Sequence, residues 1–346
     1  MTESKLRFPA EWEPQSAVMI AWPHGETDWG PRLSEVEPTY VALATAIIRF
    51  QPLLACVADP SLERRVRELL AAAGVDLSRL RTLVVPYDDT WLRDSGPISL
   101  IDDAGFRLLD FRFTGWGGKY QASRDDRLVE ACFERQAFAS RCTRHEIDFA
   151  LEGGGIETDG RGTLLTTWRC LHERHPRLSR EEIDACLRDS LRQQRVLWLE
   201  HGYLEGDDTD AHIDTLARFA PDDAIVYQSC DDPTDQHHAE LAAMAAELAA
   251  LRTLVGKPYR LLPLPWPRPI VDGGRRLAAS YANYLIVNGA VLMPAYGDPA
   301  DVAAAAVLAR AYPNREIVPI PCRPLIWQNG SLHCVTMQLP AGVANV

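Results

Sequence analysis

The alternation of helical and extended patterns constrains this chain more than any other feature of its sequence. Apolar residues recur with helical periodicity in five segments, and the centres of the last four are almost evenly spaced. We predict helices over residues 36–50, 125–136, 180–194, 238–253 and 299–312. Between them, β-rich runs predict strands at 82–86, 106–113, 163–167, 196–199, 224–228, 284–294 and 316–320. This rhythm is typical of a strand–strand–helix–strand unit repeated around an axis, although the units share no obvious sequence identity.

The length of the chain and the absence of an evident linker favour one domain over residues 1–346. A chain of 346 residues that is 47% hydrophobic can bury a large core. The segment 258–274 is rich in proline, but it is also apolar and aromatic. We therefore interpret it as an ordered surface crossing, with a domain boundary as the alternative.

Charge and cysteine content narrow the functional classes. The formal net charge is −12 without a Lys/Arg-rich block, which argues against a nucleic-acid partner and weakly favours a cationic substrate. Eight cysteines without CxxC pairs fit neither a disulfide scaffold nor a zinc ribbon. The N-terminal residues lack the apolar region of a secretion signal, and no stretch reaches the roughly 18 apolar residues of a membrane span. We expect a cytoplasmic protein, and enzymes of this size are commonly symmetric oligomers.

Two early segments place carboxylates in turns at the ends of β-rich runs, where active sites are often built. YDDTWLRDSGP carries Asp88, Asp94 and Arg93 around Trp91, and its plainer interpretation is a solvated loop with an internal ion pair. In ALEGGG, Glu152 precedes three glycines that permit a close backbone approach. A plain glycine hairpin is the alternative, whereas a phosphate loop is disfavoured because no Lys-Ser/Thr follows.

Two later segments supply a histidine and a cysteine. In LEGDDTDAHID, His212 and Asp214 are separated by one residue and would share a face on a strand. The aspartates at 207, 208 and 210 are expected to raise the pKa of His212, unless the segment is simply an acidic surface loop. In NGSLHCVTMQ, alternation predicts a strand with Cys334 near its start. A free cysteine is more often an inert core residue than a nucleophile.

Together the four segments resemble the agmatine deiminase/bacterial peptidylarginine deiminase family of the guanidine-modifying superfamily. WLRDSGP, EGGG, AHID and HCVT occur in that family's order and approximate spacing, and weaker matches extend from FPAEWEPQSAVMIAWP through FTGWGGKY and MPAYGD. The resemblance implies the pentein fold, a five-bladed α/β propeller of pseudo-repeated ββαβ units with the site at its centre. Around the cysteine, the residues Gln-Asn-Gly-Ser at 328–331 depart from the family's glycine run and Asn, which puts the substrate fit in doubt.

The resemblance also implies the role of individual residues. Cys334 becomes the nucleophile, His212 the acid/base, and the substrate-binding carboxylates are Asp94, Glu152 and Asp214. Further candidates for substrate contacts are Asp88, Trp91 and Trp116, with ordinary core packing as the alternative for each tryptophan. The chemistry asks for such a set, because a planar guanidinium cation matches carboxylates placed around it. A thiolate would attack its carbon, ammonia would leave after protonation by the histidine, and water would release the ureido product from a covalent S-amidino intermediate. No metal or cofactor enters this scheme.

Agmatine is the expected substrate, giving N-carbamoylputrescine and ammonia, and polyamine synthesis is the pathway that the resemblance implies. Peptidylarginine is the second choice and free arginine the third. A metal-dependent hydrolase built from His172, His175 and the acidic residues around His212 is a rival, although HERH lacks the spacing of HExxH. A protein that binds a cationic ligand without chemistry is the non-enzymatic alternative.

Overall fold

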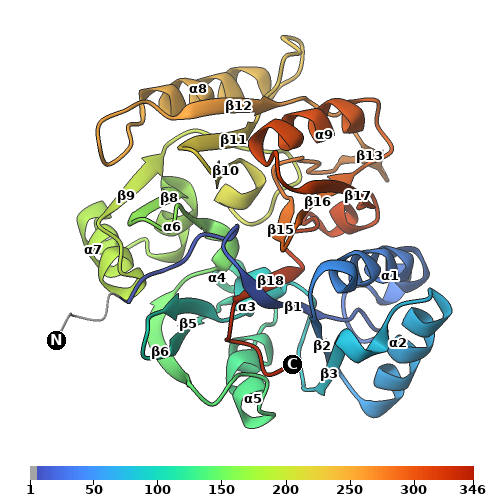
Figure 1. Ribbon diagram of the computed structural model, residues 1–346. Helices are drawn as coiled ribbons and strands as arrows, with labels where there is room; N and C mark the ends of the chain where they lie inside the picture. Colours follow the sequence, from blue (N-terminus) through green and yellow to red (C-terminus); the bar gives the residue numbers. More distant parts are fainter. Residues whose placement is uncertain (1–5) are drawn as a thin grey trace.

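Five small mixed sheets stand around a common centre in the computed structural model, which describes residues 6–346 (Figure 1). Each contains an antiparallel pair of strands followed, after a helical crossover, by a parallel strand. The pattern is the predicted strand–strand–helix–strand unit. The five-bladed α/β propeller is therefore confirmed as the fold class.

Four of the blades are formed by consecutive stretches of chain. The first contains β4 (Ile98–Ile101), β5 (Phe106–Arg112), α5 (Leu128–Glu134) and β6 (Cys142–Ala150). The second contains β7 (Ile156–Thr158), β8 (Thr163–Thr167), α6 (Trp168–Arg174), α7 (Arg180–Leu191) and β9 (Arg195–Leu199). The third contains β10 (Ala217–Ala220), β11 (Ala224–Gln228), α8 (His238–Ala250) and β12 (Arg260–Leu264). The fourth contains β15 (Leu285–Val287), β16 (Ala290–Ala295), α9 (Ala300–Ala311) and β17 (Glu316–Pro321).

The fifth blade joins the two ends of the chain. It contains β18 (Thr336–Pro340), β1 (Gln15–Ala21), α1 (Leu33–Phe50), β2 (Leu53–Val57), α2 (Pro60–Ala72) and β3 (Leu80–Val84). Strand β18 pairs antiparallel with β1, placing Met337 opposite Met19, and the two strands lie side by side near the centre of Figure 1. Pairing the last strand with the first closes the ring, and it places β1 inside the sheet between β18 and β2.

Local sequence signals explain where several elements begin and end. Helix α7 begins at a capping box in which the Ser179 side chain and the Glu182 side chain each accept from the other's backbone N–H. Helix α2 has Asp59 as its N-cap and proline at its first position. The β15–β16 hairpin turns at Asn288-Gly289, where Gly289 adopts φ 80°.

Each predicted helix and strand range overlaps an element of the structure, but helices α2 and α6 and strands β1, β2, β4, β6, β7 and β10 were not predicted. Helix α2 was not predicted, because its buried stripe consists of only three apolar residues among charged ones. The interpretation of 258–274 as a surface crossing was wrong for its first part, where β12 pairs in parallel with β11. Its Pro263 is tolerated because β12 is the edge strand of its sheet. The remainder contains a short hairpin of β13 (Val271–Asp272) and β14 (Arg275–Arg276).

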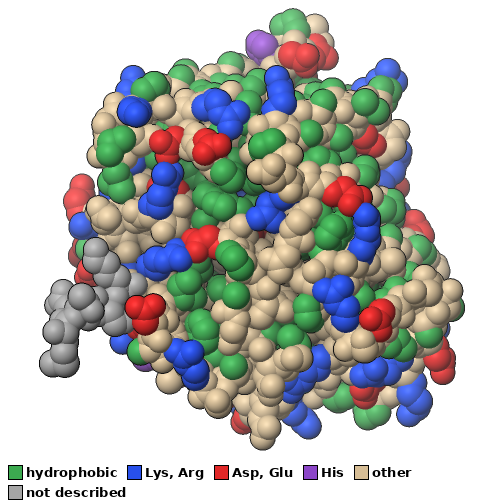
Figure 2. All heavy atoms as spheres, in the orientation of Figure 1, with side chains coloured by type: hydrophobic (Ala, Val, Ile, Leu, Met, Phe, Trp, Pro, Cys, Tyr) green, Lys and Arg blue, Asp and Glu red, His purple; other side chains and the backbone are tan. Residues whose placement is uncertain are grey.

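The surface carries charged side chains of both signs. On the face shown in Figure 2, Lys and Arg side chains are interspersed with Asp and Glu. Among residues 6–346, no helix combines the length and the apolar character needed to cross a membrane.

Ionised groups, rather than apolar ones, occupy part of the centre between the blades. Glu11, in the segment before β1, accepts hydrogen bonds from Arg218 Nη2 at 2.7 Å and from the backbone N–H of Ile286 at 2.8 Å. Its Oε2 also lies 2.7 Å from His333 Nε2. Burial raises the pKa of Glu11, but His333 and Arg218 prevail and hold it well below its usual range. This one carboxylate therefore links residues of three blades.

Replacing Glu11 by Ala should lower the free energy of unfolding by about 3–5 kcal/mol, because it leaves buried cationic partners undercompensated. Urea unfolding of the variant and the wild type measures this difference. Glu13→Ala is the matched control, since Glu13 pairs with the half-exposed Arg7 and should matter by about 1 kcal/mol or less. Equally small effects of the two substitutions would contradict the central role of Glu11.

Candidate active site

The middle glycine of the EGGG segment is the point at which three predicted site residues meet. A Cβ built on Gly154 would lie 2.6 Å from His212 Nδ1, 2.8 Å from Asp94 Oδ1 and 3.2 Å from Asp214 Oδ2. Three short helical turns hold these residues, namely α3 (Leu92–Ser95), η4 (Gly153–Gly155) and η5 (Ile213–Thr215). The glycine is thus required for space, because any side chain would occupy the volume into which these atoms converge.

Asp94 is held by one backbone and one side-chain donor. Its Oδ1 accepts from the Gly154 N–H at 3.0 Å, and its Oδ2 accepts from Trp116 Nε1 at 3.0 Å. Burial raises the pKa of Asp94 to about 6, with Asp214 and Glu152 adding to the rise and His212 opposing it. Trp116 reaches this position with φ 55°, a left-handed conformation that costs a residue of this size about 1–3 kcal/mol.

His212 lies fully buried between two carboxylates. Its Nε2 is 3.3 Å from Glu152 Oε2, and its Nδ1 is 3.7 Å from Asp94 Oδ1 without a hydrogen-bond partner. Burial lowers the pKa of His212, but Asp94 and Glu152 outweigh it and raise the pKa well above its ordinary value. The imidazole is consequently a cation near neutral pH.

The acidic run before His212 has a different role from the one predicted. Asp207 accepts the N–H groups of Thr209 and Ala211 and so shapes the turn. Asp208 accepts from Tyr120, and Asp210 pairs with Lys119 and Arg174. The raised pKa of the histidine therefore comes from Asp94 and Glu152 of neighbouring segments. The pair does not lie on a strand, since His212 caps η5 and Asp214 lies within it.

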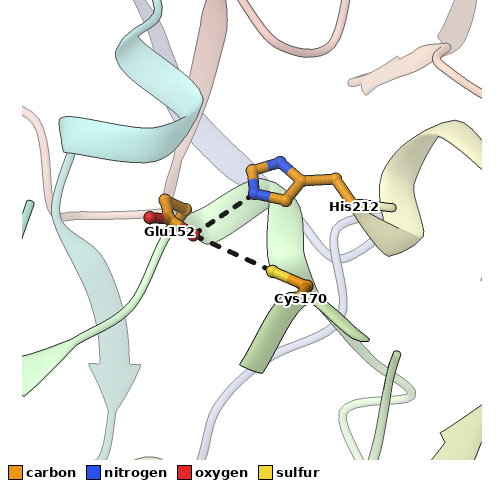
Figure 3. Close-up of side chains that lie close together, drawn as sticks. All are labelled: Glu152, Cys170 and His212. Carbon is orange, nitrogen blue, oxygen red and sulfur yellow. Dashed lines mark hydrogen bonds and ion pairs between the residues drawn. The ribbon is translucent and has the colours of Figure 1, made fainter. Parts of the chain in front are cut away.

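Glu152 is ionised and held at both oxygens. Its Oε1 accepts from Arg174 Nε at 2.7 Å, while its Oε2 faces His212 and the thiol of Cys170, which lies 3.9 Å away (Figure 3). Burial raises the pKa of Glu152, but His212 and Arg174 outweigh burial and hold the pKa below its ordinary value. Because the carboxylate engages Nε2, the free nitrogen of the imidazole is Nδ1.

Glu152, Cys170 and His212 are also the donor types that a zinc-like ion prefers, and their donor atoms lie within 4.8 Å of one another. The fit is poor, because Arg174 already supplies a positive charge to Glu152 and the imidazole is cationic. The two histidines proposed for the rival metal site contact other residues. His172 stacks on Trp168, and His175 stacks on Phe149 and bonds to the carbonyl of Ala150.

Cys334 lies in the turn before β18, not in the strand that alternation predicted, because β18 begins only at Thr336. Its Sγ is 3.8 Å from Asp214 Oδ2 and 3.2 Å from Nδ2 of Asn283. Burial raises the pKa of the Cys334 thiol well above its ordinary value, and Asp214 and Asp94 raise it further. A thiolate is therefore disfavoured until a cation enters the cluster.

Asp214 connects the histidine and the cysteine. It follows His212 in the same turn, and its Oδ2 lies near Cys334 Sγ and 2.7 Å from His333 Nδ1. Its Oδ1 is buried and has no hydrogen-bond partner. Two buried atoms, Oδ1 of Asp214 and Nδ1 of His212, thus have no hydrogen-bond partner at the place where the segments converge.

The remaining predicted residues have contacts of other kinds. Trp91 is buried in the core, where its ring packs on Trp29 and covers the α-carbon of Gly330. Asp88 accepts from the backbone N–H of Arg124 at 2.8 Å. Trp116 alone of the two tryptophans bonds directly to a cluster carboxylate.

Sequence reasoning missed four residues in direct contact with the cluster: Asn283, Arg174, His333 and Cys170. His333 adjoins the predicted cysteine, and the amide of Asn283 interrupts an otherwise apolar and aromatic run, which are faint signals at most. Arg174 gives no signal, because its contact with Glu152 joins α6 to the glycine turn.

Comparisons with known proteins give consistent relatives. A model of the Porphyromonas-type peptidyl-arginine deiminase family matches residues 7–340. A protein named agmatine deiminase from Stutzerimonas stutzeri is 36% identical over 361 residues, which cover 96% of this chain and 95% of the relative. A crystal structure described as a putative arginine deiminase from Porphyromonas gingivalis is 47% identical with a TM-score of 0.92, covering 99% of this chain and 100% of that one. A substrate-bound agmatine deiminase variant from C. jejuni is 32% identical with a TM-score of 0.90, covering 99% of this chain and 98% of that one.

Gly154→Ala should destabilise the protein by about 1–3 kcal/mol, because the methyl group overpacks the convergence point. Gly25→Ala is the matched control, since a Cβ there meets nothing within 4 Å. Thermal unfolding of both variants tests the expectation. A Gly154→Ala protein as stable as the control would show that the three functional groups do not meet there.

Proposed function

The chain belongs to the Porphyromonas-type peptidyl-arginine deiminase family, and from this premise we propose that it is an agmatine deiminase. It hydrolyses agmatine to N-carbamoylputrescine and ammonia within a single catalytic domain. The observation that carries the proposal is the buried convergence of a thiol, an imidazole and three carboxylates from distant segments. Cys334 is 4% exposed, and His212 and Asp214 are 0% exposed.

The carboxylates suit a guanidinium cation. Asp214 Oδ1 is unpartnered, so it can accept from an N–H group of the substrate without losing an existing bond. Asp94 and Glu152 lie on the other side of the imidazole. In a buried site, these acceptors hold the planar cation in one orientation. Trp116, which bonds to Asp94, is placed to contact the substrate's methylene groups.

Substrate charge activates the nucleophile in this proposal. The thiol pKa is raised by burial and by Asp214, so the free enzyme keeps Cys334 protonated. A bound guanidinium reverses that balance, because its positive charge favours the thiolate. The thiol proton then passes to solvent, and the thiolate bonds to the guanidinium carbon.

His212 serves both halves of the reaction through Nδ1. As a cation it donates a proton to the leaving nitrogen, so that ammonia departs and an S-amidino group remains on Cys334. The neutral imidazole next takes a proton from water, whose hydroxide bonds to the same carbon. The C–S bond breaks as the hydroxyl proton moves to sulfur, which yields the ureido product and restores both residues. Glu152 orients the ring by holding Nε2.

Agmatine is preferred over arginine in a protein because the reacting atoms are buried and because the full-length relatives carry the name agmatine deiminase. The name of the family model keeps peptidylarginine as the second candidate. All eight cysteines are unpaired, as is usual in a reducing compartment, so the proposal places the enzyme in the cytoplasm.

Cys334→Ser should reduce ammonia release from agmatine to background, and His212→Asn should reduce kcat by about 10²–10⁴-fold through loss of acid–base catalysis. Ammonia assays on folded variants measure both effects. Cys186→Ser is the control, because this half-buried cysteine lies on α7 and should retain full activity. Ammonia release at the wild-type rate from either site variant would refute the mechanism.

Turnover of agmatine, free arginine and an arginine-containing peptide, measured side by side, distinguishes the substrate classes. We expect the highest kcat/KM for agmatine, because the buried cluster must enclose the whole guanidinium. A peptide that reacts faster than agmatine would move the assignment to protein deimination.

A further inference from the structure

Helix α6 presents one face to the carboxylate of Glu152. Cys170 and Arg174 are four residues apart on this helix and therefore lie on the same side of it. Arg174 Nε donates to Glu152 Oε1 at 2.7 Å, and the Cys170 thiol lies 3.9 Å from Oε2. The side chain of Arg174 is only 1% exposed. A guanidinium buried to this extent needs acceptors for its other nitrogens as well.

Those acceptors belong to the turn that carries His212. Nη1 of Arg174 donates to Asp210 Oδ2 at 2.7 Å, and Nη2 donates to the carbonyl of Thr209 at 3.0 Å. The three nitrogens are thus all engaged, one with Glu152 and two with the segment immediately before the histidine. Arg174 connects the carboxylate that touches the imidazole to the backbone from which the imidazole extends.

The turn that Arg174 holds has a strained backbone. Asp210 and Ala211 adopt φ 66° and 70°, in the left-handed region that residues other than glycine rarely occupy. Such a conformation persists only where the surrounding structure maintains it. Asp207 supports the turn from within, by accepting the N–H groups of Thr209 and Ala211. Arg174 supplies the contacts that tie it to α6.

We propose that Arg174 is a positioning residue, which fixes the orientation of the His212 imidazole by clamping Glu152 and the turn at 209–210 together. With Oε1 of Glu152 held by Arg174, Oε2 faces His212 Nε2 at 3.3 Å. The other ring nitrogen, Nδ1, is then directed to the convergence point at Gly154. Arg174 acts through these neighbours and takes no part in bond making. The inference rests on the proposed function in taking His212 as the acid–base group.

Charge compensation is the competing explanation, in which Arg174 only neutralises the buried carboxylate of Glu152. One positive charge at this place would then be sufficient. Arg174→Lys separates the two explanations, because lysine keeps the charge but has one nitrogen where the guanidinium has three. A clamp that needs three separate donors fails in this variant, whereas charge compensation is retained.

The experiment measures agmatine turnover and the pKa of the His212 imidazole, the latter by NMR, in folded Arg174→Lys. We expect kcat to fall by about 10–100-fold with KM within about twofold of the wild type, because a misplaced acid–base group impairs reaction more than binding. The pKa of His212 should fall by about one unit, which is a tenfold loss of proton affinity. The direction follows because the contact with Glu152 helps to raise this pKa. His212→Asn identifies the resonances of His212.

Arg169→Lys is the matched control on the same helix. Arg169 is exposed, and its guanidinium lies 5.4 Å from the centre of the Tyr203 ring. This variant should match the wild type in kcat and in the pKa of His212.

An unchanged pKa of His212 in Arg174→Lys, or an unchanged kcat, would overturn the inference and leave Arg174 as a neutralising charge. Asp210→Ala removes one acceptor from the partly exposed end of the clamp, and it provides the same comparison with smaller losses if the lysine variant does not fold. If the wild type releases no ammonia from agmatine, the proposed function fails. The pKa of His212 in the variants still decides whether Arg174 positions the imidazole.

Discussion

Burying several carboxylates at one point is the constraint around which this protein is organised. Isolated charges in a dry interior are costly, so each must have a partner of opposite sign or a set of N–H donors. The buried acids are Glu11, Asp94, Glu152, Glu157 and Asp214, and their cationic partners are Arg93, Arg174, Arg218 and His212. Both oxygens of Glu11 have hydrogen-bond partners, whereas one oxygen of Asp214 has none. In the proposed mechanism this oxygen accepts from the substrate cation.

The propeller makes this arrangement feasible. Each blade presents a short connection to the centre, so residues from five parts of the chain can meet while the sheets behind them supply the stability. Asp94 and Glu152 flank the first blade, and His212 and Asp214 precede the third. Asn283 lies just before β15 of the fourth blade, and Cys334 lies just before β18 of the fifth. The members of the site lie in short turns between strands, and Gly154 provides the space for their convergence.

Much of this organisation was accessible from the sequence, and the physical reason for the remainder is clear. Helical periodicity predicted the blade rhythm, because amphipathic helices bury one face whatever the sheet order. The four motifs identified the nucleophile, the histidine and the carboxylates as candidates. Local patterns did not predict that Asp94 and Glu152 raise the pKa of His212, since those contacts cross between segments. For the same reason Asn283 and Arg174 were missed: their importance lies in a neighbour on another blade.

The pairing of β18 with β1 also affects when the protein can complete its folding during synthesis. Cys334, the proposed nucleophile, stands two residues before β18, and the partner of β18 is β1, the first strand among the described residues. Most of the chain must therefore be synthesised with its opening strand still lacking one neighbour. The convergent site can therefore assemble only after β18 has been synthesised and has paired with β1, which couples completion of the site to closure of the ring.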